Sequence, residues 1–256
     1  MTTDSMSTKT RVLNNSLLGA WHQVANPLLV EFSARSDLQF VSMDVQHGSF
    51  DFTSIQQALA RLSGSDCIVA VRICEADYSF AARVVDAGVN AIVAPLINTA
   101  DDVREFVSNI KYPPLGNRSW GPADAMKYGG FSDANAYLKE ANDNVLAIAM
   151  IETRDAYKNL DEILSVDGLD GVLVGPSDLS IALSNGEELN PFGERSIPVI
   201  EKVAEAAKKR GKISAIFTTK TEHTKVAQSL GYNIITISTD RGLFEAGINK
   251  LLSALD

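Results

Sequence analysis

The sequence reads LAIAMI at residues 146–151 and GVLVG at residues 171–175, and each of these short apolar runs leads to a carboxylate. Glu152 follows the first run directly, and Asp178 lies shortly after the second. Apolar runs of this length, bounded by turn signals, are typical of strands buried on both faces of a parallel sheet. The first polar residues beyond such strands lie at the carboxyl edge of the sheet, where α/β proteins place their active sites.

Short apolar segments alternate with longer amphipathic segments along the chain, which predicts repeated βα units. Eight segments have the pattern of strands: 16–20, 40–43, 67–71, 91–94, 145–151, 171–174, 213–216 and 234–237. Six have the pattern of helices: 52–62, 78–87, 99–110, 156–163, 198–209 and 221–230. Eight strands and 256 residues suit one (β/α)8 barrel, also called a TIM barrel, so we predict a single α/β domain over residues 11–256 after a flexible N-terminus at residues 1–10.

Three stretches interrupt or end this rhythm. Residues 96–144 form a long insertion rich in glycine and proline, and residues 184–196 are also irregular. Both are expected to shape or cover the mouth of the barrel, because loops at strand ends carry function. The last segment, residues 242–256, has apolar positions that either pack on its own barrel or dock a neighbouring subunit.

Composition excludes several classes of partner. The net charge is -9, with 32 acidic and 23 basic residues, and the basic residues are scattered, which argues against nucleic acid and anionic membranes. The sequence shows neither the apolar core of a signal peptide nor an apolar run of membrane-spanning length. Cys67 and Cys74 lack a CxxC context and are interpreted as reduced thiols, with a disulfide between them as the alternative; reduced thiols favour a cytoplasmic protein.

Charged residues gather at the predicted carboxyl ends of several strands. Asp44 and His47 follow the second strand, Arg72 ends the third, and a barrel would bring them to the same mouth as Glu152 and Asp178. A buried guanidinium needs an anion, which would be a substrate oxyanion or a carboxylate of the barrel itself. The imidazole of His47 could act as a general base at neutral pH.

Two carboxylates with no cysteine and one histidine nearby favour a hard divalent cation, Mg²⁺ or Mn²⁺, for which Co²⁺ could substitute. Two protein ligands would leave positions open for a chelating substrate and water, as Lewis-acid catalysis requires. Structural alternatives stay open for both residues. Glu152 could form a salt bridge to Arg154 or another neighbour, and Asp178 could cap a helix that begins at Leu179.

The chain resembles the HpcH/HpaI class II aldolases, a family that includes 4-hydroxy-2-oxoheptanedioate aldolase and 2-keto-3-deoxy sugar-acid aldolases. The resemblance extends over nearly the whole chain. Its segments are GAW at 19–21, DVQHG at 44–48, VR at 71–72, DAG at 86–88 with AP at 94–95, YPPLGNR at 112–118, IETR at 151–154 and GPSDLS at 175–180.

The resemblance implies a (β/α)8 barrel assembled as a homo-hexamer or trimer with exchanged C-terminal helices. It implies a divalent metal on Glu152 and Asp178 and a pyruvate-binding role for Arg72. The catalytic histidine of the family corresponds to His47, with Asp44 nearby.

Further roles also follow from the resemblance alone. Asp86 of an adjacent subunit would orient the imidazole of His47. The backbone of Gly175, Pro176 and Ser177 would line the pyruvate pocket.

Gln46 and Arg118 bear on the choice of substrate. Gln46 stands where several family members have glutamate, which removes a negative charge beside the histidine and makes the imidazolium less favoured. Arg118, on the long insertion, is expected to hold the cover or to bind a distal acid group of the substrate.

These features predict a divalent-metal-dependent, reversible retro-aldol cleavage of a 4-hydroxy-2-oxo acid to pyruvate and an aldehyde. A lysine-imine aldolase would need a desolvated lysine in the barrel, whereas no predicted strand contains one and Lys212 only precedes the seventh strand. A metal-dependent oxo-acid decarboxylase, or a related pyruvate-enolate enzyme, is the nearest alternative. A catalytically silent barrel that binds an oxo acid is the other, although binding alone needs no base.

Overall fold

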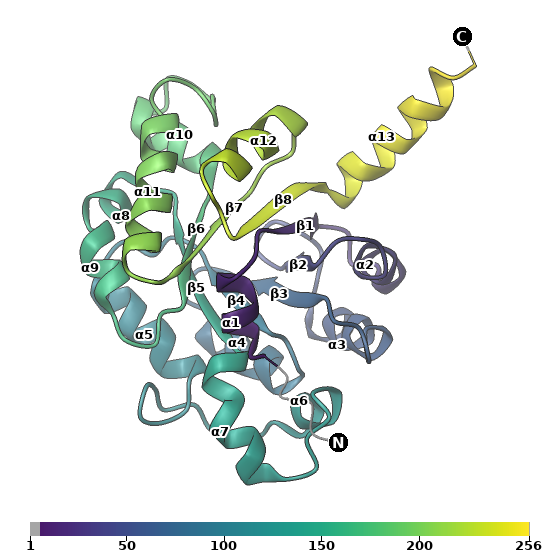
Figure 1. Cartoon of the computed structure of the whole chain (residues 1–256), viewed down its shortest axis with the longest axis vertical. Helices are drawn as coiled ribbons and strands as arrows, with labels where there is room; N and C mark the ends of the chain where they lie inside the picture. Colours follow the sequence, from purple (N-terminus) through teal and green to yellow (C-terminus); the bar gives the residue numbers. More distant parts are fainter. Residues whose placement is uncertain (1–5, 256) are drawn as a thin grey trace.

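A closed barrel of eight parallel strands forms the centre of the molecule in the computed structural model, which describes residues 6–255 (Figure 1). The strands follow one another in chain order, and β8 pairs with β1 to close the barrel. Their bounds are β1 Leu17–His22, β2 Phe40–Asp44, β3 Ile68–Arg72, β4 Ala91–Ala94, β5 Leu146–Ile151, β6 Gly171–Val174, β7 Ile213–Ile216 and β8 Ile234–Thr239. The eight predicted strands and the single-domain (β/α)8 fold are confirmed.

Helices surround the barrel and cover the outer faces of the strands. Their bounds are α1 Thr8–Leu13, α2 Pro27–Ala34, α3 Phe52–Arg61, α4 Tyr78–Asp86, α5 Ala100–Ile110, α6 Ala123–Tyr128, α7 Ala134–Asn144, α8 Arg154–Lys158, α9 Leu160–Ser165, α10 Pro176–Ser184, α11 Ile197–Lys209, α12 Thr221–Ser229 and α13 Asp240–Leu252. Local signals set several starts: Asp51 and Thr99 form capping boxes at the first residues of α3 and α5. Among the described residues, no helix is both long and apolar enough to cross a membrane.

Some helices differ from the sequence-based prediction. The single helix expected over residues 156–163 is two helices, α8 and α9, which meet at Asn159. The side chain of Asn159 donates a hydrogen bond to the carbonyl of Asn98 at 2.8 Å, and this tertiary contact accompanies the break. The insertion at residues 96–144 contains α6 and α7, which the patterns miss because α6 buries none of its residues and α7 buries only Tyr137 and Ala141.

The N-terminal segment closes the amino-terminal end of the barrel. Val12 of α1 belongs to the apolar cluster inside the barrel, and Lys9 forms an ion pair of 3.0 Å with Asp170. Helix α1 begins at Thr8, so the last residues of the segment 1–10 are helical. Residues 1–5 lie outside the described part of the chain.

Alternation of side chains along the strands positions the functional groups. Leu146, Ile148 and Met150 point into the barrel, whereas the alternate residues of β5 pack beneath the helices. Glu152 is the next position of the inward series, one step beyond the strand. In the same way, Arg72 continues the inward series of β3.

The last helix, α13, projects away from the barrel (Figure 1). Phe244 is 70% exposed and Leu251 is 72% exposed, and Ile248 and Leu252 are exposed as well. The alternative in which this segment packs on its own barrel is therefore wrong, because these side chains have no apolar cover from the described residues of the same chain.

Candidate active site

A cavity of about 190 Å³ opens at the carboxyl ends of the strands. It brings together residues from β1, β3 and β5, from the loops after β1, β2, β6 and β7, and from the first turn of α10. Its lining consists of Trp21, Gln23, His47, Arg72, Met150, Gly175, Pro176, Ser177, Asp178 and Phe217. Six of these were predicted from the sequence as site residues, so the structure brings most of the predicted mouth together.

Arg72 and Asp44 form a bidentate ion pair at one wall of this cavity. The Nε of Arg72 donates to Oδ1 of Asp44 at 2.9 Å, and Nη2 donates to Oδ2 at 2.6 Å. Asp44 and Arg72 are direct partners in the β2–β3 register, and the indole of Trp21 donates to Asp44 at 3.2 Å. Burial alone would raise the pKa of Asp44, but the hydrogen bonds and charge of Arg72 outweigh it and hold the pKa below its usual value.

The sequence leaves two anionic partners open for Arg72, a barrel carboxylate and a substrate oxyanion, and the structure is compatible with both. The structural partner of Arg72 is a barrel carboxylate, and its guanidinium still faces the cavity. Because Asp44 engages Nε and Nη2, the planar group is fixed in one orientation at the edge of the cavity. Such a fixed cation is suited to binding a carboxylate or a developing oxyanion.

Glu152 lies deep at the mouth and is 4% exposed. Its Oε1 accepts a hydrogen bond of 2.7 Å from the amide of Leu96, whose φ of 54° lies in the left-handed region. Burial raises the pKa of Glu152, and the nearby carboxylate of Asp178 raises it further, while the Leu96 amide opposes both. A buried carboxylate facing a second carboxylate is an arrangement that a divalent cation would relieve.

The structural alternatives for these two carboxylates are not observed. Arg154 donates to the carbonyl of Leu183 instead of Glu152. Asp178 is the third residue of α10, whose N-cap is Gly175, and it makes no capping bond there. A Cβ at Gly175 would lie 2.8 Å from Oε2 of Glu152, so only glycine lets the backbone approach this carboxylate so closely.

The donor set fits a hard divalent metal with few protein ligands. Glu152 and Asp178 supply carboxylate oxygens, which such ions prefer. Over residues 6–255 there is no group of three or more His, Cys, Asp or Glu side chains placed to hold a metal. Two carboxylates at an open cavity would leave the remaining positions to substrate and water.

His47 is exposed at the rim of the cavity. Its amide donates to Oδ1 of Asp44 at 3.2 Å, which ties the loop after β2 to the buried ion pair. At Gly48, a Cβ would lie 2.2 Å from the carbonyl oxygen of Asp44, so the tight turn here requires glycine. Gln46 is half-buried and does not belong to the cavity lining.

Asp86 and Arg118 lie elsewhere in the chain. Asp86 is the last residue of α4, at the end of that helix that faces away from the mouth, and Arg118 donates to its Oδ1 through Nη2. Arg118 is buried and its guanidinium lies 4.6 Å from the centroid of the Tyr112 ring. Within one chain, Arg118 therefore holds Asp86 instead of contacting the cavity, since burial and ion pairing hold its side chain there. A contact of Asp86 with His47 would need a second subunit.

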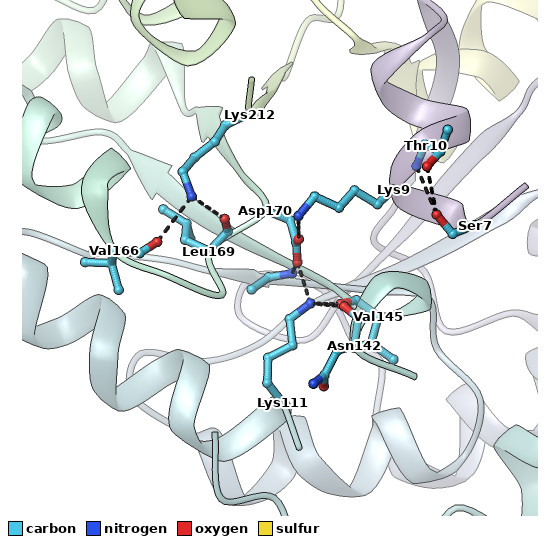
Figure 2. A network of polar contacts seen from close by, with 11 residues as sticks. Ser7, Lys9, Thr10, Lys111, Asn142, Val145, Val166, Leu169, Asp170 and Lys212 are labelled. Atoms are coloured by element: carbon cyan, nitrogen blue, oxygen red, sulfur yellow. Dashed lines mark hydrogen bonds and ion pairs between the residues drawn. The ribbon is translucent and has the colours of Figure 1, made fainter. Parts of the chain in front are cut away.

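The buried Lys111 and the half-buried Lys212 belong to a network of polar contacts around Asp170 (Figure 2). Lys111 donates to Oδ2 of Asp170 at 2.6 Å, and Lys212 donates to the carbonyls of Val166 and Leu169. Burial lowers the pKa of Lys111. Asp170 precedes β6, so this network lies at the amino-terminal end of the strands, away from the cavity. The lysines are not placed to form an imine with a substrate at the mouth.

Several lining residues were not predicted from the sequence as site residues. Phe217 follows β7 directly, but the rule that selected Glu152 after β5 looks for polar residues and therefore passes over it. Trp21 lies in a segment that carries the family resemblance, but its role was not assigned. The amide of Leu96 acts through backbone geometry, for which the sequence carries no recognisable signal.

Comparisons with known proteins agree with this geometry. Residues 17–246 match the model of a family described as HpcH/HpaI aldolase/citrate lyase. A hydroxypyruvate/pyruvate aldolase from Rhizorhabdus wittichii is 33% identical over 92% of each chain. A 2-keto-3-deoxy-L-rhamnonate aldolase from Klebsiella pneumoniae is 28% identical over 92% of this chain and 87% of the relative. The crystal structure of an HpcH/HpaI aldolase from Desulfitobacterium hafniense has a TM-score of 0.88 and 27% identity, covering 98% of this chain and 97% of the other.

Proposed function

The chain belongs to the HpcH/HpaI aldolase/citrate lyase family, and we propose that it is a class II pyruvate aldolase. The reaction would be the reversible retro-aldol cleavage of a 4-hydroxy-2-oxo acid to pyruvate and an aldehyde. The observation that carries the proposal is the cavity that Asp178 and Arg72 both line, next to the buried Glu152, whose pKa both of these charges affect. The names of the relatives, which are pyruvate and sugar-acid aldolases, support the same reaction class.

Glu152 and Asp178 would hold a divalent cation, Mg²⁺, Mn²⁺ or Co²⁺. When bound, such an ion supplies Lewis-acid stabilisation to the enolate of pyruvate. Arg72, held rigid by Asp44, would bind the 2-oxo acid and stabilise the negative charge that develops on the enolate oxygen. Gly175, Pro176 and Ser177 begin α10, and the unpaired backbone N–H groups of a helix N-terminus, to which Pro176 contributes none, favour a carboxylate.

His47 would act as the general base. It would take the proton of the C4 hydroxyl while the C3–C4 bond breaks, so that the bonding electron pair enters the pyruvate enolate and the aldehyde leaves. The same imidazolium would return the proton to C3 of the enolate. In an assembled oligomer, Asp86 of a neighbouring subunit would orient the imidazole, and exchanged α13 helices would join subunits into a trimer or hexamer.

The test is a pyruvate-release assay across a panel of 4-hydroxy-2-oxo acids with Mg²⁺, Mn²⁺ or Co²⁺, and with a chelator as the control. We expect turnover with at least one substrate and its loss after complete metal removal. Turnover that survives metal removal would contradict the mechanism. Treatment with borohydride in the presence of pyruvate adds a second arm, because a covalent adduct would indicate an imine mechanism.

An oxo-acid decarboxylase that uses the same enolate would release carbon dioxide without an aldehyde, and the same panel distinguishes it. A silent binding barrel would bind metal and oxo acid but show no turnover. His47 at the rim argues for the aldolase, because simple binding of an oxo acid does not need a base. A cytoplasmic location stays a prediction.

A further inference from the structure

Asp240, the first residue of α13, lies where the projecting helix meets the loops of the mouth. It is 6% exposed, which is unusual for a charged residue at the base of an exposed helix. Its Oδ2 accepts hydrogen bonds from the amides of Gln23 at 3.1 Å and Val24 at 2.8 Å. Because Gln23 lines the cavity, this one carboxylate connects α13 to the wall of the site.

The loop that Asp240 holds is itself joined to the loop that carries His47. The carbonyl of Gln23 accepts from the amide of Ser49 at 2.8 Å and from its hydroxyl at 3.2 Å. The Ser49 hydroxyl in turn accepts from the amide of Ala25 at 2.9 Å. A Cβ at Gly48 would lie 2.8 Å from the carbonyl oxygen of Gln23, so the two loops pack backbone against backbone. A shift of Gln23 must therefore move the segment next to His47.

Hydrogen bonds from backbone amides fix the position of the Asp240 carboxylate. Its other oxygen, Oδ1, accepts from the amide of Arg241 at 2.9 Å. The nearest charged or titratable partner is His22, whose Nδ1 lies 3.8 Å from Oδ2, and neither ring nitrogen of His22 has a hydrogen-bond partner among the described residues. The carboxylate is thus satisfied by backbone amides, which have fixed directions, and not by a flexible cation.

We propose that Asp240 is a positioning residue: through the amides of Gln23 and Val24 it fixes the loop that supports His47, and so couples the site to the orientation of α13. Since α13 exposes its apolar side chains and would dock on a second copy, assembly would set the geometry of the base. This inference rests on the proposed function, because its consequence is read in aldol turnover. Through Asp240, the helix α13, which lies away from the reacting atoms, would influence the reaction.

The test compares Asp240→Asn and Asp240→Glu with the matched control Asp133→Ala, which removes a capping carboxylate from α7 away from the mouth. Asparagine removes the charge, whereas glutamate keeps the charge and displaces the oxygens. We expect both to lower kcat for pyruvate release by roughly 10- to 100-fold, the scale of a misplacement of about 1 Å, with a smaller change in KM. The control should keep the wild-type kcat.

Hydrogen–deuterium exchange provides a readout that does not depend on turnover. In Asp240→Asn, peptides covering residues 22–26 and 45–50 should exchange faster, whereas those of the control should match wild type. Wild-type kcat in both Asp240 variants would overturn the inference, as would a loss of kcat without faster exchange in residues 45–50. If the wild-type protein shows no aldol turnover at all, the proposed function fails, and the exchange comparison still decides whether Asp240 holds the two loops together.

Discussion

At the scale of single residues, Glu152 shows how position and environment together create a function. Alternation along β5 places it on the inward side, the strand end places it at the mouth, and burial beside Asp178 raises its pKa. An isolated carboxylate in this place would be destabilising. A bound cation would make the buried carboxylate of Glu152 a metal ligand. This role accounts for a carboxyl group with a raised pKa beside an open cavity.

Replacing Glu152 with glutamine tests this role. Because residues that only support a metal ligand already change affinity by about 10- to 100-fold, we expect loss of the ligand itself to lower Mn²⁺ affinity by roughly 100-fold or more. Titration calorimetry with Mn²⁺ measures the affinity, and pyruvate release should fall with it at limiting metal. The control is Glu187→Gln on the exposed irregular stretch after α10, which should bind Mn²⁺ as wild type does. Unchanged affinity in Glu152→Gln would remove this residue from the ligand set.

His22 gives a pH dependence with a definite sign. Burial lowers its pKa from 6.5 to about 4, against the opposing charge of Asp240. The unfolded chain therefore binds a proton that the folded chain does not bind between these values, so stability is present above pH 6.5 and falls as the pH drops towards 4. The shift corresponds to roughly 3 kcal/mol per chain.

Thermal unfolding between pH 4 and pH 7 measures this effect. The melting temperature of the wild type should fall on acidification more steeply than that of His22→Gln, in which no group titrates at this site. His223→Gln is the comparison: burial also lowers the pKa of His223 on α12, but this ring is less buried than that of His22, so its replacement should flatten the curve less. Parallel curves for wild type and His22→Gln would show that this histidine does not contribute to acid sensitivity.

The sequence predicts some of these residues and not others for physical reasons. Arg72 could be identified because a guanidinium in an apolar run needs an anion. Arg118 was expected at the substrate because it lies on the long insertion, yet its partner is Asp86, and such a pairing of distant segments leaves no local pattern. The amide of Leu96 and the carboxylate of Asp240 act through backbone hydrogen bonds that only the folded chain reveals.

At the scale of elements, buried strands are predicted well because each carries its own apolar run. The helices α6 and α7 escape prediction because few of their side chains reach the core, so the periodic signal is weak. The C-terminal segment shows the opposite case. Its apolar positions are plain in the sequence, but the sequence cannot tell whether they meet their own barrel or a second subunit.

Exposed apolar residues on α13 predict that this helix assembles the protein. Phe244 and Leu251 would be buried against another copy, and charges there would be costly to desolvate. We expect Phe244→Glu combined with Leu251→Glu to convert the oligomer into a monomer that keeps its circular dichroism spectrum. Light scattering after gel filtration measures the mass. Glu245→Gln on the same helix is the control and should assemble normally; a double variant that assembles as wild type would show that α13 is not the interface.

At the scale of the whole molecule, the two ends of the barrel have different tasks. The carboxyl end carries the cavity, where Glu152 is buried beside a second carboxylate and the Asp44–Arg72 pair borders open space. The amino-terminal end carries the Lys111–Asp170 ion pair and the Lys9 contact, which Figure 2 shows, and Val12 of α1 packs into the apolar cluster there. In barrels of this type, the first end is associated with catalysis and the second with stability.

The variant Lys111→Met tests whether the amino-terminal end of the barrel contributes to stability and not to catalysis. Among the described residues, it leaves the buried Asp170 with Lys9 as its ionic partner and the amide of Ala147 as a hydrogen-bond donor. Removal of one member of a buried ion pair costs about 3–5 kcal/mol. At roughly 2–4 °C per kcal/mol for a chain of this size, the melting temperature should fall by about 6 °C or more. The kcat and KM of the folded protein should stay at wild-type values, because the hydrogen bonds of the Lys111 ammonium go to Asn142, Val145 and Asp170, which are not cavity-lining residues. Lys212→Met, which removes bonds to two carbonyls but no direct ion pair, should destabilise less. A variant Lys111→Met that melts as wild type but turns over slowly would contradict the division, since it would place this buried network in catalysis and not in the stability of the barrel.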